Sequence, residues 1–497
     1  MSNQHKFCIV GAGMSGIVMG IRLKQAGFDD FVIYEKAASL GGTWRENTYP
    51  GVACDVPAYY YSYSFAHKAD WSRKFAPGAE IREYFEDVAR KFEIESHIQY
   101  NSEVENASFD GKQWNVLLKN GQADNFDVLL CATGILHRAK IPNIKGSDSF
   151  KGKLFHSSQW NHDIDLSDKR VAVIGSGSTG IQMVGPLSRQ VKELHLFQRS
   201  PQWIMPAPDK VYSNREKLFR RIIPGWARFQ YAYTKKIFEA FTDLVLNDGW
   251  QRKVVRTYTE KNLARVKDDA LREKLTPDYP HACKRLVMSN NFYPAVQNDH
   301  VHMITEGIDQ ITENGILTKD GAVHELDVIV LSTGFDAHAF MRPMSMQNEN
   351  GLTIDKAWEK TIEAYHTTCV PEFPNFFMVL GPNSPVGNFS VIAAAELQTN
   401  YILQCIKKKV AGGFDSVVIS KEATSAYNET IREAMKSTIW VSGCTSWYQD
   451  ASGNFITWPW TPKKFSNDLK KPILKDFVFA NKVAAESSDT KQAETAS

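Results

Sequence analysis

The sequence lacks any uncharged apolar run of about eighteen residues, the length that a membrane-spanning helix requires. Its first strand-like run begins at Lys6, which leaves no room for the charged segment, apolar core and cleavage site of a secretory signal. It has no basic tract and a formal net charge of only +2, so nothing favours nucleic acid as a partner. These absences predict a soluble chain located in the cytoplasm.

Cysteine is scarce, with 7 residues scattered over 497 positions. No two cysteines have the C-x-x-C spacing of a disulfide oxidoreductase, and none joins histidines at zinc-ligand spacing. Cys8 and Cys131 lie in apolar runs, where a buried and unreactive thiol is expected. The sequence therefore predicts neither a metal centre nor a thiol relay.

Two segments share one pattern of strand, glycine turn, helix and strand. The loop G-A-G-M-S-G at 11–16 precedes a strand-like run at 31–35, and the loop G-S-G-S-T-G at 175–180 precedes one at 194–199. Each segment has the form of a βαβ unit that opens a doubly wound sheet. The glycines of such a loop permit a sharp turn and let the backbone approach a pyrophosphate. We therefore expect two dinucleotide sites.

The residue at the end of each second strand distinguishes the two nucleotides. Glu35 follows Gly16 by nineteen positions, and Arg199 follows Gly180 by the same spacing. A carboxylate there accepts hydrogen bonds from ribose hydroxyls and repels a 2′-phosphate, which suits FAD. A guanidinium offers a permanently charged fork to a phosphate, which suits NADPH.

The order of these units predicts an α/β fold of two Rossmann-like dinucleotide-binding domains, with the NADP domain inserted in the FAD domain. Strand-like runs at 127–134 and 327–334 also end in glycine turns, and the second is expected to return the chain to the first domain. The expected division is an FAD domain at 1–163 and 331–485, an NADP domain at 164–330 and a disordered tail at 486–497.

A segment of different character, at about 212–278, interrupts the NADP domain. Apolar residues recur there at three- or four-residue spacing with basic residues between them, and Pro224-Gly225 must break the helix. The pattern predicts a helical excursion packed on the NADP domain. A membrane-surface or substrate-entry helix within 212–245 stays open as an alternative.

Two longer motifs carry a resemblance to a known family. The run G-G-T-W-R-E-N-T-Y-P-G-V-A-C-D at 41–55 resembles the signature [A/G]-G-x-W-x4-[F/Y]-P-[G/M]-x3-D of Baeyer–Villiger monooxygenases at every specified position. The run F-K-G-K-L-F-H-S-S-Q-W-N at 150–161 resembles their second fingerprint, F-x-G-x3-H-x3-W-[P/D], except that Asn161 replaces Pro or Asp. The resemblance extends to about Pro462, and the C-terminal part is most similar to the branch with hydroxyacetophenone monooxygenases.

That resemblance implies an enzyme in which NADPH reduces FAD and oxygen adds to the flavin as a C4a-peroxide. The peroxide anion attacks a ketone, and the adduct rearranges to an ester or lactone. Arg285 matches the family's active-site arginine, which stabilises the anion, and Asp55 matches the carboxylate that orients it. His156 and Trp160 match residues of a linker that couples the two domains.

The loops and the resemblance together imply two sets of cofactor-binding residues. The FAD set is Gly11, Gly13, Ser15, Gly16, Glu35, Gly42, Thr43, Trp44, Asp55, Tyr61 and Val104. The NADP set is Gly175, Gly177, Ser178, Thr179, Gly180, Gln182, Arg199, Ser200 and Lys284.

Other readings of the same pattern remain. A related flavin monooxygenase would make sulfoxides or N-oxides, although Trp160, Asp55 and Arg285 argue against it. An NADPH oxidase with the same fold would release only hydrogen peroxide, and a non-catalytic flavin-binding redox sensor is a remote alternative. The expected partners are O2 and a small ketone, or a sulfide. The sequence indicates neither the individual substrate nor the oligomeric state.

Overall fold

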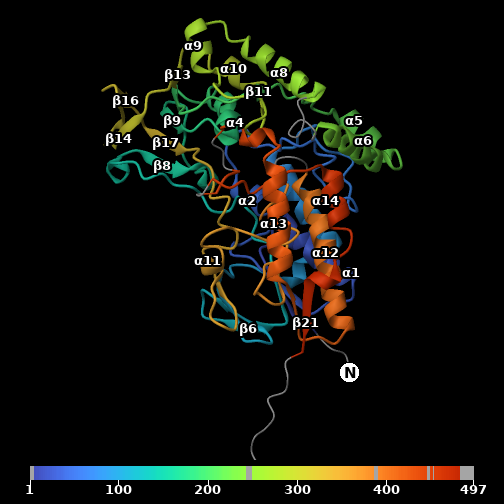
Figure 1. Ribbon diagram of the computed structural model, residues 1–497. Coiled ribbons are helices and arrows are strands. Elements are labelled where there is room, and N and C mark those ends of the chain that lie inside the picture. The colour runs from blue at the N-terminus through green and yellow to red at the C-terminus, as the bar shows by residue number, and fades with distance from the viewer. Residues whose placement is uncertain (1–4, 242–248, 386–389, 445–447, 451–452, 482–497) are drawn as a thin grey trace, which may run out of the picture.

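Two lobes, each built on a parallel five-stranded sheet, make up the molecule (Figure 1). The computed structural model describes residues 5–241, 249–385, 390–444, 448–450 and 453–481. The tail expected at 486–497 lies outside the described residues. Among the described residues, no helix is long and apolar enough to cross a membrane.

The first sheet has the strand order β19-β7-β1-β2-β3. Its strands are β1 (Phe7–Val10), β2 (Phe31–Tyr34), β3 (Ile98–Gln99), β7 (Val128–Cys131) and β19 (Phe376–Met378). Alternate residues of its central strands point to opposite faces, so each face has its own core. One face packs against α1 (Met14–Gln25), α3 (Gly78–Lys91) and α12 (Val391–Ala411). The other packs against an antiparallel sheet that contains β4 (Val104–Phe109), β5 (Trp114–Leu118), β6 (Ala123–Phe126) and the parallel edge strand β18 (Ser345–Gln347).

The second sheet repeats this plan with the order β13-β10-β9-β17-β8. Its strands are β8 (Lys153–His156), β9 (Arg170–Ile174), β10 (Glu193–Phe197), β13 (Val301–Ile304) and β17 (Val328–Leu331). One face packs against α4 (Ser178–Leu187) and α10 (Phe292–Ala295). The other packs against a small antiparallel sheet, in which β15 (Gly315–Thr318) pairs with β14 (Ile308–Thr312) on one side and with β16 (Val323–Glu325) on the other. The two expected βαβ units and the α/β fold class are confirmed.

The strand β8 lies on the other side of the expected domain boundary. It pairs with β17 along the edge of the second sheet, so this sheet begins before residue 163, where the sequence placed the change of domain. The reason is that one edge of β17 has backbone groups available for a parallel partner. The short run Lys153–His156 pairs with Val328–Leu331 along that edge. The remaining division into domains stays a prediction.

The excursion is helical, as expected, and ends its first helix before Pro224. Its described helices are α5 (Asn214–Ile222), α6 (Trp226–Phe241), α8 (Trp250–Leu263) and α9 (Asp269–Lys274). The helix α8 contacts β11 (Ile204–Met205), which pairs with β12 (Val287–Met288) of the same lobe. The helices α5 and α6, which we call the arm (214–241), instead project from the side of the molecule (Figure 1) and contact Tyr59 and Tyr60 of the first lobe. The expectation that the whole excursion packs on the NADP domain is therefore wrong for the arm.

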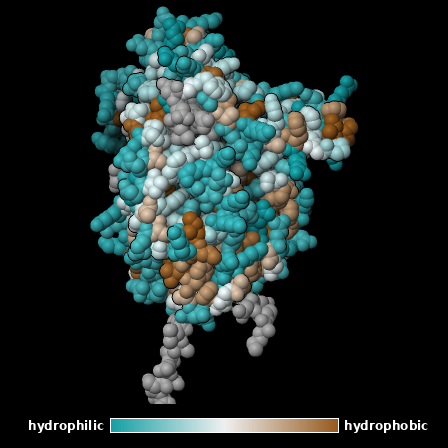
Figure 2. Space-filling model, turned by 45° about the vertical axis from the view of Figure 1, so that its right-hand side comes forward, coloured by the Kyte–Doolittle hydropathy of each residue, from teal (hydrophilic) through white to brown (hydrophobic). Residues whose placement is uncertain are grey.

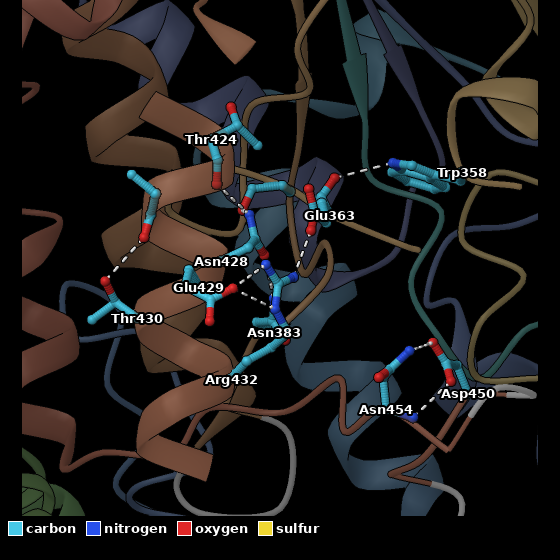
Figure 3. A network of polar contacts seen from close by, with 12 residues as sticks. Trp358, Glu363, Asn383, Thr424, Asn428, Glu429, Thr430, Arg432, Asp450 and Asn454 are labelled. Atoms are coloured by element: carbon cyan, nitrogen blue, oxygen red, sulfur yellow. Dashed lines mark hydrogen bonds and ion pairs between the residues drawn. The ribbon is translucent and has the colours of Figure 1, made fainter. Parts of the chain in front are cut away.

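The C-terminal elements brace the first lobe. They are α11 (Ile354–Ala357), α13 (Lys421–Met435), α14 (Pro462–Asp468), β20 (Ser416–Ile419) and β21 (Phe477–Ala480). From α13, Asn428 accepts a hydrogen bond from Asn383, at 3.1 Å, while Arg432 bonds Glu363 and Glu429 (Figure 3). Asn383 belongs to a buried segment that precedes α12, so α13 holds that segment in place.

Candidate active site

A cavity of about 2240 Å³ lies between residues of both lobes. Small-molecule sites usually occupy roughly 300–1,000 Å³, so this cavity has room for more than one ligand of that size. Its lining includes both glycine loops, the motif at 41–55 and the segment 284–288. The cavity therefore brings together the parts of the sequence from which two nucleotide sites were expected.

Nearly all of the expected site residues line this cavity. Of the FAD set, every member except Gly16 contributes to the wall, and of the NADP set, every member except Gly180 does so. Each of these two glycines instead faces the first glycine of its own loop. A Cβ on Gly16 would be 1.9 Å from the Gly11 oxygen, and one on Gly180 would be 2.1 Å from the Gly175 oxygen. The missing side chain therefore lets each helix close on its loop, and the part of these two glycines in nucleotide binding stays a prediction.

The middle glycine of each loop borders open space. A Cβ built on Gly177 would meet nothing within 4 Å, and one built on Gly13 would meet only Gly42, at 3.6 Å or more. Both residues line the cavity, so the protein leaves the space beside them free. A pyrophosphate that approaches the backbone at the start of a helix needs such a space. Both loops therefore fit a dinucleotide.

Glu35 is fixed beside the first loop. Its Oε2 accepts a hydrogen bond from the Ala12 amide at 2.8 Å, and its Oε1 accepts one from the Ala37 amide at 3.0 Å. The side chain is buried, follows directly after β2 and lines the cavity. An ionised carboxylate has about four lone-pair sites, so this one retains acceptor capacity for ribose hydroxyls.

Positive charge gathers at the end of β10, beside the second loop. Lys284 donates a hydrogen bond from Nζ to the Ser200 hydroxyl at 3.1 Å. Burial and the neighbouring Arg199 both lower the pKa of Lys284, because each disfavours the charged ammonium. Two cations and a hydroxyl group that face one cavity form a suitable site for a phosphate group.

Arg285 and Asp55 form an ion pair across the two lobes. The guanidinium donates from Nε and Nη2 to the same carboxylate oxygen, at 3.2 and 2.5 Å. About a quarter of each side chain is exposed, 28% for Arg285 and 27% for Asp55. The negative charge of Asp55 raises the pKa of Arg285 above its already high value. The cavity wall thus carries a guanidinium that stays charged and is held by a carboxylate.

The profile of the flavin-binding monooxygenase-like family matches residues 4–438 of the sequence. The chain belongs to that family. An uncharacterised monooxygenase of Mycobacterium bovis is 45% identical over 92% of both chains. A Baeyer–Villiger monooxygenase of Streptomyces coelicolor is 37% identical over 95% of this chain and 92% of its own. Another, from Pseudomonas aeruginosa, is 37% identical over 91% and 87%.

Solved structures agree with this membership. The protein OTEMO in complex with FAD and NADP has a TM-score of 0.86 and 27% identity, over 97% of this chain and all of that one. Oxidised steroid monooxygenase bound to NADP has the same score and identity over 96% of this chain. The family resemblance, the flavoprotein monooxygenase class and the two-nucleotide fold expected from the sequence are confirmed.

The signature motif of this monooxygenase also serves to join the lobes. Gly51 has a φ of +87°, and a Cβ there would lie 2.6 Å from the Gln182 oxygen of α4. The Gln182 side chain accepts from the Tyr49 hydroxyl at 2.9 Å and donates to the Ala53 oxygen at 3.0 Å. Burial raises the pKa of Tyr49 to about 12, so its hydroxyl keeps the proton that it donates. Gln182 therefore connects the lobes as well as lining the cavity.

Further members of the FAD set come from the segment 42–61. Gly42, with a φ of +53°, precedes the single turn α2 (Thr43–Glu46). Trp44 donates from Nε1 to the Tyr61 hydroxyl at 3.1 Å, and burial raises the pKa of that hydroxyl. Together they give this part of the cavity a rigid, neutral and largely apolar wall.

His156 and Trp160 do not line the cavity. His156 is buried at the end of β8, with Nε2 3.0 Å from the Gly334 oxygen and Nδ1 2.8 Å from the Ser158 hydroxyl. Burial lowers its pKa, so the imidazole is neutral at pH 7. The ring of Trp160 packs edge-on against Phe155. Both residues lie where β8 meets the chain leaving β17, which is compatible with the expected linker between the lobes.

A disulfide that was not predicted from the sequence joins Cys283 to Cys444, 161 positions further along the chain. Spacing rules find only near neighbours, so this pair gave no signal. The bond ties the segment that carries Lys284 and Arg285 to the C-terminal segment, where buried Tyr448 lies close to Arg285. Neither cysteine lines the cavity, so the pair is a tether and is not placed as a redox relay.

A cluster across β10 and β13 was missed for the same reason. The parallel register sets His195 opposite His302, and Glu193 brings a third ligand atom within 4.8 Å of theirs. Such a group could hold a metal ion, whereas the spacing of histidines and cysteines along the sequence predicts no metal centre. The cluster does not belong to the cavity wall.

Proposed function

We propose that this monooxygenase converts ketones into esters or lactones, with FAD as its flavin, NADPH as reductant and O2 as the source of oxygen. The observation that carries the proposal is the Arg285–Asp55 ion pair in one cavity with both glycine loops. The relatives named as Baeyer–Villiger monooxygenases support the same class of reaction.

The chain's own groups would stabilise negative charge that develops on the reacting oxygen atoms. A bound flavin supplies the electrons and the activation of oxygen. Arg285 contributes a guanidinium that cannot lose its proton at neutral pH and that presents fixed N–H donors. Asp55 takes two of those donors, which leaves the others to point at the substrate in a set direction.

The nucleotides are assigned by the groups that face the cavity. Glu35 takes the ribose of FAD, and Gly13 and Gly177 leave room for the two pyrophosphates. Arg199, Ser200 and Lys284 take the 2′-phosphate that distinguishes NADPH from NADH. His156 and Trp160 couple movements of the two lobes. The cytoplasmic location stays a prediction.

The test is a balance of NADPH, oxygen, peroxide and product with purified enzyme and a panel of aryl, cyclic and long-chain ketones. Ketone-dependent NADPH consumption with little peroxide and one ester per NADPH supports the proposal. Sulfoxide formation in the absence of any ester would favour the heteroatom oxygenase, and stoichiometric peroxide with every ketone would favour the oxidase.

A further inference from the structure

The exposed apolar residues of this protein are concentrated on one segment. Among the described residues, large apolar side chains with high exposure gather between Val211 and Tyr258 more than in any other stretch of similar length. On the arm, Leu218, Phe219 and Ile222 of α5 are each more than half exposed. In Figure 2, hydrophobic surface appears at the tip of the projecting part at upper right. Scattered single residues are normal on a surface, whereas a gathered patch indicates an interaction site.

The patch is continuous from one helix to the other. Phe219 of α5 contacts Trp226 with ring centroids 6.5 Å apart, and Trp226 contacts Phe229 at 6.2 Å. Phe229 stacks on Tyr233 at 6.2 Å, and Ile237 follows one turn later on the same side of α6. A single stripe of aromatic and aliphatic groups therefore crosses the arm.

Basic residues border this stripe. The arm has seven lysines and arginines against two glutamates, a net charge of +5, whereas the whole chain has only +2. Arg221, Arg228 and Lys236 are exposed, and Arg228 and Lys236 directly precede Phe229 and Ile237. Both described glutamates of the arm lie near a lysine, Glu216 with Lys210 and Glu239 with Lys235.

The opposite side of α6 is occupied by the protein itself. Tyr231 and Phe238 pack against Tyr60 with ring centroids 5.7 and 5.8 Å apart, which fixes the rotation of the helix. Tyr233 and Ile237 are 55% and 42% exposed and also line the large cavity. The exposed stripe therefore runs to an edge of the cavity, so that a ligand held at the stripe would be next to the cavity.

We propose that the arm docks on the surface of an anionic phospholipid membrane. The aromatic and aliphatic stripe enters the boundary between headgroups and acyl chains, and the flanking arginines and lysines bind phospholipid headgroups. Aromatic rings with basic neighbours suit this interface, because one part is apolar and the other is wet. The cavity then opens beside the membrane. Apolar substrates concentrate in the membrane, so they would be close to the cavity. This inference does not rest on the ketone reaction.

The test is flotation of the FAD-loaded enzyme with vesicles of equimolar phosphatidylglycerol and phosphatidylcholine, and with vesicles of phosphatidylcholine alone. The wild type is expected to float with the anionic vesicles and to be released by high salt. The double variants F219S/F229S and R221E/R228E should each lower the partition coefficient by about tenfold or more. None of these four residues lines the cavity, so bound flavin and its NADPH-dependent reduction should be unchanged.

Matched controls come from elsewhere on the surface. V323S/V478S removes two exposed apolar side chains, and K407E/K408E reverses two exposed charges, both away from the arm. These variants should float like the wild type. Equal loss in the controls, or no flotation of the wild type, would overturn the proposal. So would a wild-type dimer in sedimentation velocity that F219S/F229S dissociates without any vesicle binding, since a second copy would then cover the stripe.

Discussion

Asp55 and Arg285 meet although 230 positions separate them in the chain. Each comes from a different lobe, so the ion pair exists only when the lobes are correctly placed. The strength of such a pair depends on its surroundings, and a partly buried arginine with a single carboxylate partner keeps free donors for a ligand. Among the residues that line the cavity, this pair indicates most directly that negative charge is stabilised there.

Replacing Arg285 by alanine should preserve FAD binding and reduction by NADPH, but should lower ester formation by about 100- to 1,000-fold, because one preorganised charge donor is lost. Arg285→Lys keeps the charge without the fork and should recover part of the rate. Anaerobic reduction followed by product analysis separates the two steps. Wild-type ester yield from the alanine variant would remove Arg285 from the mechanism.

Arg199→Ala tests the phosphate site at the end of β10. Loss of a charge-assisted hydrogen bond costs about 1.5–3 kcal/mol, so the KM for NADPH should rise about 10- to 100-fold. The KM for NADH, which has no 2′-phosphate, should change little. Steady-state kinetics with both nucleotides measures this, and an equal rise for both would show that Arg199 supports the fold and not the phosphate.

At the scale of elements, the glycine loops were the most predictable feature. Their spacing places strand, turn and helix in one order, and the structure has β1 then α1 and β9 then α4 as expected. The edge strand β8 was less predictable, because its residues pair only with β17, far along the chain. The packing of the arm also escaped prediction, since a helical pattern identifies an apolar face without naming the surface that it contacts.

Gly177→Val should separate nucleotide binding from folding. No atom lies within 4 Å of a Cβ at this position, and φ is −75°, so the folded protein should accept the side chain. The valine would occupy the space left for the NADPH pyrophosphate, so NADPH affinity should fall at least tenfold while FAD content and melting temperature stay unchanged. Isothermal titration with NADP+ measures the effect. Unchanged affinity would place the nucleotide elsewhere.

At the scale of the whole molecule, the large cavity lies where the two lobes meet, and contacts between residues far apart in the chain hold that junction. Gln182 joins Tyr49 to Ala53, and Gly51 allows α4 to approach. The motif that contains Gly51 was visible in the sequence, but its contact with α4 was not. The Cys283–Cys444 disulfide adds a covalent tie that no spacing rule reveals.

Cys444→Ser should loosen the segment that carries Arg285. A disulfide that closes a long loop typically contributes about 2–4 kcal/mol, so the apparent melting temperature should fall by a few degrees in oxidising buffer. In reducing buffer, the wild type should approach the variant. Thiol titration of the denatured wild type should find five free thiols out of the seven cysteines. Seven thiols, or equal melting under oxidising conditions, would contradict the tether.

The proposed insertion of oxygen into a ketone can be followed with an oxygen isotope. The most direct measurement is turnover of a reactive ketone with NADPH under ¹⁸O2, with mass spectrometry of the product and a parallel assay for peroxide. We expect an ester or lactone that carries one ¹⁸O atom, formed in step with NADPH consumption, and almost none with Arg285→Ala. Labelled peroxide without labelled ester from any ketone of the panel would contradict it.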